Sequence, residues 1–304
     1  MTFIRILALS LVAMALTGCA KLENLQPANF SAYTVDASTL SNPAFIKGTY
    51  TEEKGGLLSG TLVRETFVLG LDGHTGFLAK HLNTSMPLSP GLHSLTIAYW
   101  IGEKRGSVPV RLDAKPGASY VIKEEDGEKT IKTVLSGFTP NYLYIADEKT
   151  GEIVTPKMAD LLSAVPDRYQ PPADAAVPIR GTAVRPDILD VDAVYVRAVD
   201  GRFVREQKSD ALGGDDYYDY EAQVMLTPGL HALSIGLGAG PFPGLYPILF
   251  EAKPGAAYVV KFERGLKRNG TNKWFVYTVW IEDEKTGAVV MPKVDVQSER
   301  LRTL

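Results

Sequence analysis

The amino-acid sequence predicts an all-β protein with two tandem β-sandwich domains that arose by internal duplication. Three long phrases occur twice in the same order, and Pro-Gly, Asp-Gly and Thr-Gly pairs separate segments in which apolar and polar residues alternate. A phrase that recurs at a fixed separation indicates a repeated structural unit. Period-two alternation between turn residues is typical of strands.

The composition of the chain is that of an ordinary folded protein. Its 304 residues suit one to three domains, and 45% hydrophobic with 22% charged residues supply enough apolar material for a core. The net charge of −3 provides no basic field to attract phosphates, so nucleic acid is not an expected partner. No pattern calls for a cofactor.

The N-terminal residues are typical of an export signal. Residues 1–5 carry the positive charge of Arg5, and residues 6–16 form an uninterrupted run of apolar and small residues. Because a membrane-spanning helix needs roughly 20 apolar residues, this shorter run behind a positive charge predicts a signal peptide over residues 1–18.

Leu16, Thr17, Gly18 and Cys19 resemble the lipobox of bacterial lipoproteins. The resemblance implies that the Cys19 thiol receives diacylglycerol and that Cys19 becomes the new N-terminus. Cys19 is the only cysteine of the chain, so no intramolecular disulfide competes for it. The alternative is an ordinary secretory signal that happens to contain a cysteine. Two or three acyl chains together anchor a protein stably.

The residue after the cysteine bears on location. It is Ala20 and not the Asp that retains similar Gram-negative lipoproteins at the inner membrane. We therefore expect an outer-membrane lipoprotein facing the periplasm, attached to the membrane through Cys19, with residues 19–43 as its lipidated tether.

The repeats define the domain boundaries. Seven of ten residues are identical between 88–97 and 226–235, eight of eleven between 113–123 and 251–261, and nine of thirteen between 145–157 and 281–293. Shorter matches join 46–49 to 179–182 and Asp72-Gly73 to Asp200-Gly201. We expect sandwich copies at 44–157 and 179–293, a Pro-rich linker at 158–178 and a C-terminal tail at 294–304.

Turn chemistry and alternation predict the strands of each copy. Asp-Gly favours a type I′ hairpin turn, and Pro-Gly favours a type II turn. The rhythm of six to eight short strands per copy is that of an immunoglobulin-like or transthyretin-like sandwich. The predicted inward-facing residues are Leu95, Ile97, Tyr99, Val108, Val110 and Leu112 in the first copy, and Leu233, Ile235, Leu237, Tyr246, Ile248 and Phe250 in the second.

Two phrases also resemble known envelope domains. Pro-Gly-x-His-x-Leu-x-Ile and Lys-Pro-Gly-Ala-x-Tyr are similar to a pattern in small envelope-lipoprotein β-domains, and the first of them is similar to the PEGA repeat. The resemblance covers roughly the second half of each copy. It implies a β fold in the cell envelope and no particular reaction.

His93 and His231 occupy the same position in both copies. Each follows a Pro-Gly turn and opens an inward strand face, so we expect a structural ring that bonds a turn carbonyl. A ligand or acid–base role is the alternative. The structural role is favoured because no carboxylate recurs at a fixed spacing from the two histidines. A three-histidine metal site of His74, His81 and His93 has no counterpart in the second copy, and we assign no metal.

An acidic, tyrosine-rich insertion is the one candidate contact loop of the second copy. A solvated hairpin tip is its expected role, with partner contact and then calcium binding as alternatives, because the spacing does not match an EF-hand. The candidate residues are Asp215, Asp216, Tyr217, Tyr218, Asp219, Tyr220 and Glu221.

These features predict a binding or structural role in the envelope, as an adaptor or assembly factor that contacts an envelope protein or polymer. No catalytic signature is present, so we do not expect an enzyme. The alternatives are a periplasmic module that binds a small ligand or metal, and a hydrolase with a site between the copies. A cleft with His93 or His231 against a carboxylate would favour an enzyme, and a flat apolar patch would favour a partner.

Replacing Cys19 by Ser tests the anchor. The variant should lose its lipid and accumulate as an uncleaved precursor or a soluble periplasmic form, because the acylated thiol is absent. Palmitate labelling and detergent partitioning of membranes measure this. Labelling and partitioning equal to those of the unaltered chain would refute the lipobox interpretation.

Overall fold

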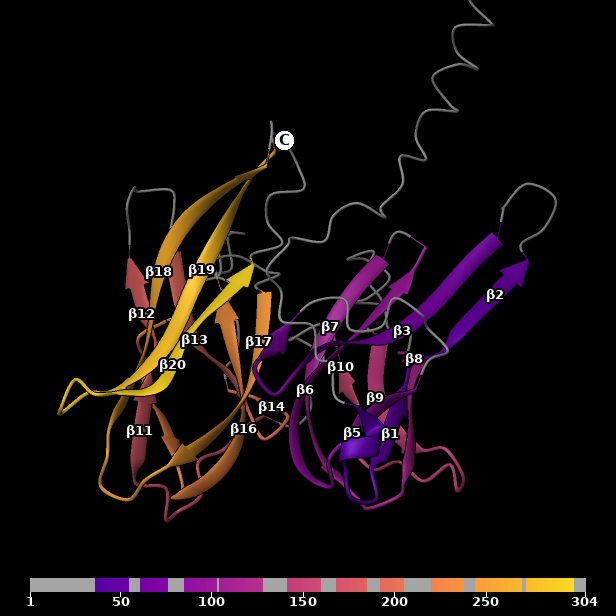
Figure 1. Ribbon diagram of the computed structural model, residues 1–304, viewed down its shortest axis with the longest axis horizontal. Coiled ribbons are helices and arrows are strands. Elements are labelled where there is room, and N and C mark those ends of the chain that lie inside the picture. The colour runs from indigo at the N-terminus through magenta and orange to yellow at the C-terminus, as the bar shows by residue number, and fades with distance from the viewer. Residues whose placement is uncertain are drawn as a thin grey trace, which may run out of the picture. The chain divides into compact units, whose positions relative to one another are not determined.

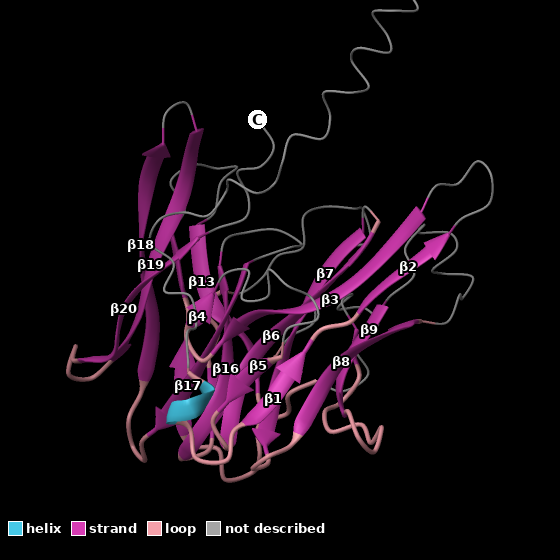
Figure 2. Cartoon of the chain, turned by 45° about the vertical axis from the view of Figure 1, so that its right-hand side comes forward, coloured by secondary structure: helices cyan, strands magenta, loops and turns pink. Residues whose placement is uncertain are grey.

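The chain folds into strands connected by turns. The structure is a computed structural model, and it describes residues 36–54, 61–75, 85–102, 104–127, 141–159, 168–184, 192–204, 220–237, 244–269 and 272–297. In these ranges the only helical element is a single 3-10 turn, Ala37–Thr39, capped by the Asp36 carboxylate (Figure 2). The all-β prediction is confirmed.

The first half of the structure comprises ten strands among the described residues. They are β1 (Ala44–Lys47), β2 (Tyr50–Lys54), β3 (Thr61–Leu71), β4 (His74–Thr75), β5 (Met86–Leu88), β6 (Gly91–Ile101), β7 (Lys104–Ala114), β8 (Ser119–Asp126), β9 (Asn141–Asp147) and β10 (Met158–Ala159).

The second half also comprises ten described strands, which include the long β18–β19 hairpin drawn in orange and yellow in Figure 1. They are β11 (Val177–Arg180), β12 (Thr182–Val184), β13 (Asp192–Val199), β14 (Arg202–Phe203), β15 (Val224–Leu226), β16 (Gly229–Leu237), β17 (Gly244–Ala252), β18 (Tyr258–Asn269), β19 (Asn272–Asp283) and β20 (Val289–Gln297).

Each half contains two sheets with equivalent strand orders. Sheet A runs β10-β9-β8-β1-β5 and sheet C runs β20-β19-β18-β11-β15. Sheet B runs β2-β3-β6-β7 and sheet D runs β12-β13-β16-β17, with β4 and β14 beside β3 and β13. A β-bulge interrupts both the β3–β6 and the β13–β16 ladders at the same place. Equivalent orders and bulges are what two copies of one unit would have, and duplication stays our proposed origin for them.

The core of each half lies between its two sheets. All the predicted inward-facing residues, from Leu95 to Phe250, are at most 5% exposed, and they belong to two separate clusters. The cluster of the first half includes Ile46 and Ile122 of sheet A together with Leu95 and Val110 of sheet B. The face assignments made from alternation are therefore confirmed, and both halves are β-sandwiches.

The repeated turn phrases adopt the conformations that their residues favour. Asp72-Gly73 and Asp200-Gly201 have positive φ at both positions, as a type I′ turn requires. In the Lys-Pro-Gly-Ala turns, Gly117 and Gly255 have φ near +70°, and the Ala amide donates to the Lys carbonyl. The same Lys amides, of Lys115 and Lys253, donate to the hydroxyls of Tyr120 and Tyr258 at 2.9 and 3.1 Å, which explains why each phrase ends in Tyr.

Gly48 and Gly181 allow the chain to pass from one sheet to the other. A Cβ on Gly48 would lie 1.7 Å from the carbonyl oxygen of Thr66, and one on Gly181 would lie 2.2 Å from that of Val194. Both contacts are with backbone, which cannot move aside without disturbing β3 or β13. This close approach gives a physical reason for the glycine in the Ile-Lys-Gly-Thr and Ile-Arg-Gly-Thr phrases.

An ion pair of reversed polarity joins the two sheets of each half. In the first half Arg64 of β3 lies 3.2 Å from Asp126 of β8, and it also pairs with Glu124. In the second half the equivalent position of β13 is Asp192, which lies 2.5 Å from Arg264 of β18. Both halves therefore contain an ion pair at this place, with the cation and the anion on opposite strands.

The strands extend beyond two of the predicted boundaries. Strand β10 and the first residues of β11 lie inside the predicted 158–178 linker, and β20 continues to Gln297 inside the predicted tail. The linker residue Tyr169 is buried, with its hydroxyl donating to the Met225 carbonyl at 2.7 Å and its amide donating to that of Phe203. The proline-rich segment 158–178 is therefore a connection, and part of it packs into the second half.

The central strands of sheets B and D are buried on both faces because the two sheets contact one another. Small outward-facing side chains occupy the middle of β6 and β16, where Ser94, Thr96 and Ser234 are at most 3% exposed. The Ser94 hydroxyl donates to the Leu233 carbonyl at 3.0 Å, and the Tyr246 hydroxyl donates to the Gly73 carbonyl at 2.8 Å. Alternation predicted the inward faces alone and gave no prediction of this contact.

Substituting Gly48 or Gly181 by Ala should destabilise the protein by about 1–3 kcal/mol or more, because the added methyl overlaps a backbone carbonyl. Urea unfolding measures the loss. Gly265→Ala is the matched control: it is also in a strand, but its Cβ would lie 3.8 Å from the nearest atom, so it should be tolerated. Equal stability of Gly48→Ala and Gly265→Ala would contradict the crossing argument.

Candidate functional site

Most of the sequence-predicted site residues lie outside the described residues. These are Cys19, Asp215, Asp216, Tyr217, Tyr218, Asp219 and His81. Of the acidic, tyrosine-rich insertion, Tyr220 and Glu221 are described, and the Tyr220 ring lies 5.2 Å from that of Tyr195 in a tilted arrangement. The roles proposed for this insertion therefore stay predictions.

His93 and His231 each form a clamp with an aspartate. The Nδ1 atom of His93 lies 2.5 Å from Oδ2 of Asp72, and that of His231 lies 2.9 Å from Oδ2 of Asp200. The other carboxylate oxygen accepts from the backbone amide of the next strand residue, Ser94 or Ala232. Each aspartate thus fastens its type I′ turn to the first residues of β6 or β16.

The second ring nitrogen of each histidine bonds a turn carbonyl. Nε2 of His93 lies 2.7 Å from the Ser89 oxygen, and Nε2 of His231 lies 2.8 Å from the Thr227 oxygen. A carbonyl and an ionised carboxylate only accept hydrogen bonds, so both ring nitrogens must donate and each ring is held as an imidazolium. The expected bond to a turn carbonyl is present in both halves.

The pKa values agree with a cationic ring. Burial lowers the pKa of His93, but the hydrogen bonds to Asp72 and to the Ser89 carbonyl outweigh it and leave that pKa above its usual value. The Asp200 hydrogen bond raises the pKa of His231 against the opposing effect of burial. Burial alone would raise the pKa of Asp200, but the bonds from His231 and the Ala232 amide lower it.

No carboxylate recurs at a fixed chain spacing from these histidines, yet the structure places one beside each of them. Asp72 and Asp200 were recognised as turn residues, but their spacing to the histidine, 21 and 31 residues, differs because a loop of different length intervenes. The equivalence of the two Asp-Gly pairs was the available signal. Two repeated phrases that meet in a β-sandwich can place their polar residues together whatever the loop length.

The clamp and a neighbouring hydroxyl contain the three residue types of a hydrolytic triad but not its chemistry. The Ser89 hydroxyl lies 3.4 Å from Nε2 of His93, and the Thr227 hydroxyl lies 3.3 Å from that of His231. A general base needs a free nitrogen lone pair, whereas Nε2 already donates to the nearer carbonyl. His93 and His231 are also only 3% and 6% exposed, so a substrate has little access to either ring.

The geometry also bears on metal binding. Neither ring nitrogen of His93 has a lone pair available while both donate hydrogen bonds, so His93 cannot ligate a metal in this arrangement. Among the described residues, no group of three or more His, Cys, Asp or Glu side chains is placed to hold a metal ion.

A second repeated feature lies on the outer faces of sheets A and C, away from the cores. In the first half Lys157 stands 5.1 Å over the Tyr144 ring, and in the second half Lys293 stands 4.2 Å over the Trp280 ring. The adjoining Ile153–Val154 and Val289–Val290 pairs are exposed. We name these residues together the aromatic–aliphatic surface. Of the seven exposed large apolar side chains in the described ranges, four belong to it, two in each half.

An Asp-x-x-Thr-Gly turn supports this surface in each half. Asp147 accepts hydrogen bonds from the amides of Lys149 and Thr150, and Asp283 accepts the equivalent bonds from Lys285 and Thr286. Hydrogen bonds from these backbone amides lower the pKa of both aspartates. The thirteen-residue repeat therefore encodes a rigid turn that presents two aliphatic residues.

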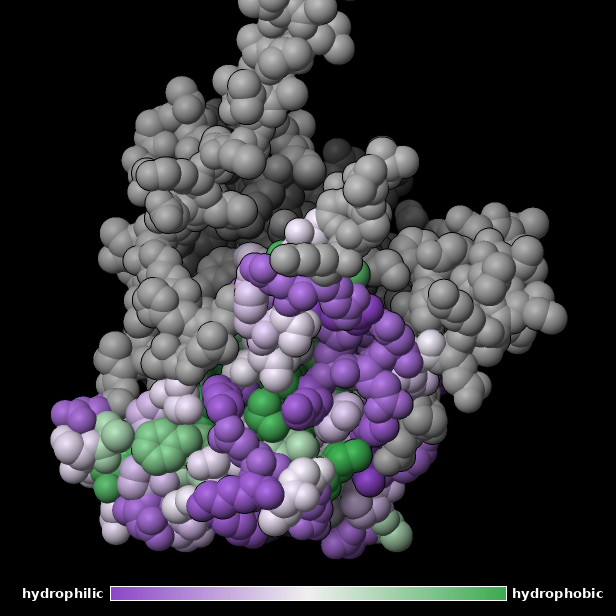
Figure 3. Space-filling model, turned by 90° about the vertical axis from the view of Figure 1, so that its right-hand side faces the viewer, coloured by the Kyte–Doolittle hydropathy of each residue, from purple (hydrophilic) through white to green (hydrophobic). Residues whose placement is uncertain are grey.

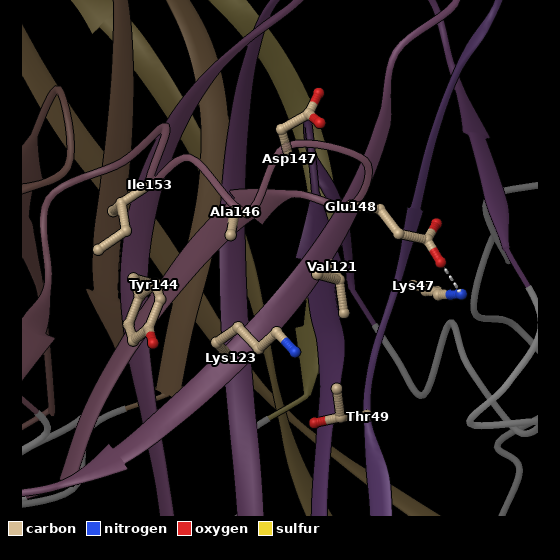
Figure 4. A pocket seen from close by; sticks show the side chains of 10 residues that line it. Lys47, Thr49, Val121, Lys123, Tyr144, Ala146, Asp147, Glu148 and Ile153 are labelled. Atoms are coloured by element: carbon tan, nitrogen blue, oxygen red, sulfur yellow. Dashed lines mark hydrogen bonds and ion pairs between the residues drawn. The ribbon is translucent and has the colours of Figure 1, made fainter.

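A hollow of about 460 Å³ opens beside the aromatic–aliphatic surface of the first half. Figure 4 shows Tyr144 and Ile153 on one side of it and the Lys47–Glu148 ion pair on the other. Val121 and Ala146 form its apolar floor, and the Lys123 ammonium points toward the space between Val121 and Thr49 (Figure 4). On the face drawn in Figure 3, hydrophobic side chains form small areas surrounded by hydrophilic ones.

Comparison with known protein families, with curated proteins and with solved structures finds no match for this chain. Within the described ranges, no helix combines the length and the apolar character needed to cross a membrane.

Raising the pH should weaken the clamps. Their folded-state pKa values are raised, so the stabilisation is complete below the unfolded value of about 6.5 and is lost as the pH rises through the folded pKa. Urea unfolding of the full chain between pH 6 and 9 should show falling stability. The His93→Gln/His231→Gln variant should be less stable at pH 6, by about 1.5–3 kcal/mol per charge-assisted bond, and should vary less with pH. A wild-type stability that is constant or increases over this range would show that the rings are not cationic.

Proposed function

We propose that this chain is an outer-membrane lipoprotein that faces the periplasm and binds an envelope protein or polymer through the aromatic–aliphatic surface of its two β-sandwiches. The lipobox-like residues support the anchor, with Cys19 as the lipidated residue. The observation that carries the binding role is the repeated exposure of Ile153–Val154 and Val289–Val290 beside a lysine-capped aromatic ring.

The exposed side chains of this surface lie outside the cores of the sandwiches. The four aliphatic side chains are 40–53% exposed, and the Asp147 and Asp283 turns hold them in place. An ordered apolar residue on a rigid turn binds at low entropic cost, because little conformational freedom remains to be lost. A binding role as an adaptor or assembly factor follows, with small-ligand binding as the alternative class.

The clamp geometry disfavours the hydrolase alternative at the two described places where a histidine bonds an aspartate, His93–Asp72 and His231–Asp200. A buried imidazolium whose two nitrogens both donate has no lone pair with which to activate a nucleophile. The proposal therefore assigns His93 and His231 to stability and the outer faces of sheets A and C to recognition.

The test replaces the exposed aliphatic residues. Ile153→Ser/Val289→Ser should fold as stably as the unaltered chain, since exposed substitutions usually change stability by less than about 0.5 kcal/mol. It should fail to complement a deletion strain, and a photo-crosslinker at Val154 should lose its adduct in this variant.

The matched control is Val184→Ser/Leu230→Ser. Val184 and Leu230 are 52% and 50% exposed, as much as Ile153 and Val289, but they lie outside the aromatic–aliphatic surface. This control should complement and crosslink normally. Equal phenotypes for the two double variants would remove the assignment of binding to this surface.

A further inference from the structure

The hollow of the first half and the equivalent place in the second half differ in charge at one cross-strand pair. Val121 pairs with Ala146 across β8 and β9, and Val259 pairs with Glu282 across β18 and β19. The flanking cross-strand pairs are equivalent as well: Lys123 faces Tyr144, and Lys261 faces Trp280. The two outer faces therefore share a lysine and an aromatic ring, and the second half alone has a carboxylate between them.

Glu282 occupies its place with full hydrogen bonding. Its Oε2 atom lies 2.9 Å from the Lys261 ammonium, and its Oε1 atom accepts from the Trp280 indole N–H at 2.7 Å. The hydrogen bonds from Trp280 and Lys261 lower the pKa of Glu282. In the second half the lysine and the aromatic donor are thus satisfied by an internal carboxylate.

In the first half the same position holds a methyl group. With Ala146 in place of a glutamate, the floor of the hollow is open and, within the described part of the chain, Lys123 has no ion-pair partner. The neighbouring charges are already engaged: Lys47 pairs with Glu148, and the Asp147 carboxylate accepts bonds within its own turn. Asp147 also points away from the hollow in Figure 4.

We infer that the hollow of the first half binds a peptide carboxylate, which takes the place that Glu282 occupies in the second half. Lys123 supplies the charge and the Tyr144 hydroxyl the donor that Trp280 supplies to Glu282. Val121, Ala146 and Ile153 contact the aliphatic part of the bound residue. This inference rests on the proposed binding role of the adjoining surface and names the chemistry of its ligand.

The hollow suits this ligand in size and in polarity. About 460 Å³ is the lower range of small-molecule sites and accommodates one amino-acid residue with its flanking peptide groups. An ammonium above an apolar floor selects an anion that carries a short aliphatic chain. A glutamate side chain and the carboxyl end of a peptide both meet that description.

Ligand-observed NMR with the detergent-solubilised full chain at low ionic strength tests the inference. The probes are N-acetylglutamate with its main-chain carboxyl amidated, which carries only a side-chain carboxylate, and N-acetylalanine, which carries only a terminal one. Their amide counterparts, N-acetylglutamine amide and N-acetylalanine amide, are the neutral controls. At least one acidic probe should saturate one site per chain, and the better one identifies the source of the carboxylate. The neutral controls should not bind.

Four variants assign the site. Lys123→Gln should weaken binding about fivefold, the size of an exposed ion-pair contribution, and Lys261→Gln, the equivalent change in the second half, should leave it unaltered. Ala146→Glu should abolish binding, because the new carboxylate fills the hollow and pairs with Lys123. Glu282→Ala should create a second site, so that two probes bind per chain. Thermal melts confirm that each variant is folded.

The results separate this inference from the proposed function. Absence of probe binding, equal binding of acidic and neutral probes, or normal binding by Ala146→Glu would overturn the carboxylate site. If Ile153→Ser/Val289→Ser still abolished complementation in that case, the surface would keep its binding role with a different ligand. If the unaltered chain binds the acidic probes and Ile153→Ser/Val289→Ser complements fully, the carboxylate site is supported and the binding role of the aromatic–aliphatic surface is refuted.

Discussion

The paired histidine and aspartate of each half are the interaction on which the rest of the sandwich depends. Asp72 or Asp200 occupies a left-handed turn and reaches across to a ring at the start of β6 or β16, so one carboxylate fixes the turn, the strand register and the ring. A buried cation is costly unless it is paired and hydrogen-bonded, and here both nitrogens are. The same turns contact the other half: Asp200 lies 3.3 Å from Arg111, and the Gly73 amide donates to the Pro247 carbonyl. The clamp thus links local turn chemistry to packing within and between the halves.

Much of this architecture was predictable because it depends on local chemistry. Alternation identified the inward faces, and Asp-Gly and Lys-Pro-Gly-Ala identified turns whose φ values only such residues adopt readily. The burial of Ser94 and Ser234 was not predictable from alternation, since a small polar residue suits both solvent and a close contact between sheets. The Asp72–His93 and Asp200–His231 pairs were missed because chain spacing does not report contacts made across two strands and a loop.

The candidate site was harder to predict than the fold. The thirteen-residue repeat is evident in the sequence. Its longest run of identical residues, the Asp-Glu-Lys-Thr-Gly turn, supports the aromatic–aliphatic surface and has no place in the proposed carboxylate site. The informative positions are those that differ inside the repeat, Ala146 against Glu282 and Tyr144 against Trp280. Only the pairing of β8 with β9 and of β18 with β19 shows that these residues share one face with Lys123 and Lys261. A comparison of copies by identity alone discards this information.

The reversed polarity of the ion pairs Arg64–Asp126 and Asp192–Arg264 has a consequence for how the chain reaches its native state. Two neighbouring units with equivalent strands can form hybrids in which a strand of one unit enters the other, a known failure of tandem repeats. In such a hybrid β3 would meet β18 with Arg64 against Arg264, and β13 would meet β8 with Asp192 against Asp126. Each hybrid places like charges together where the correct unit has an attraction, so reversed polarity penalises the wrong partner as well as stabilising the right one. The reversed polarity of the two ion pairs therefore disfavours the insertion of a strand of one unit into the other during folding, although the two sandwiches have equivalent strands.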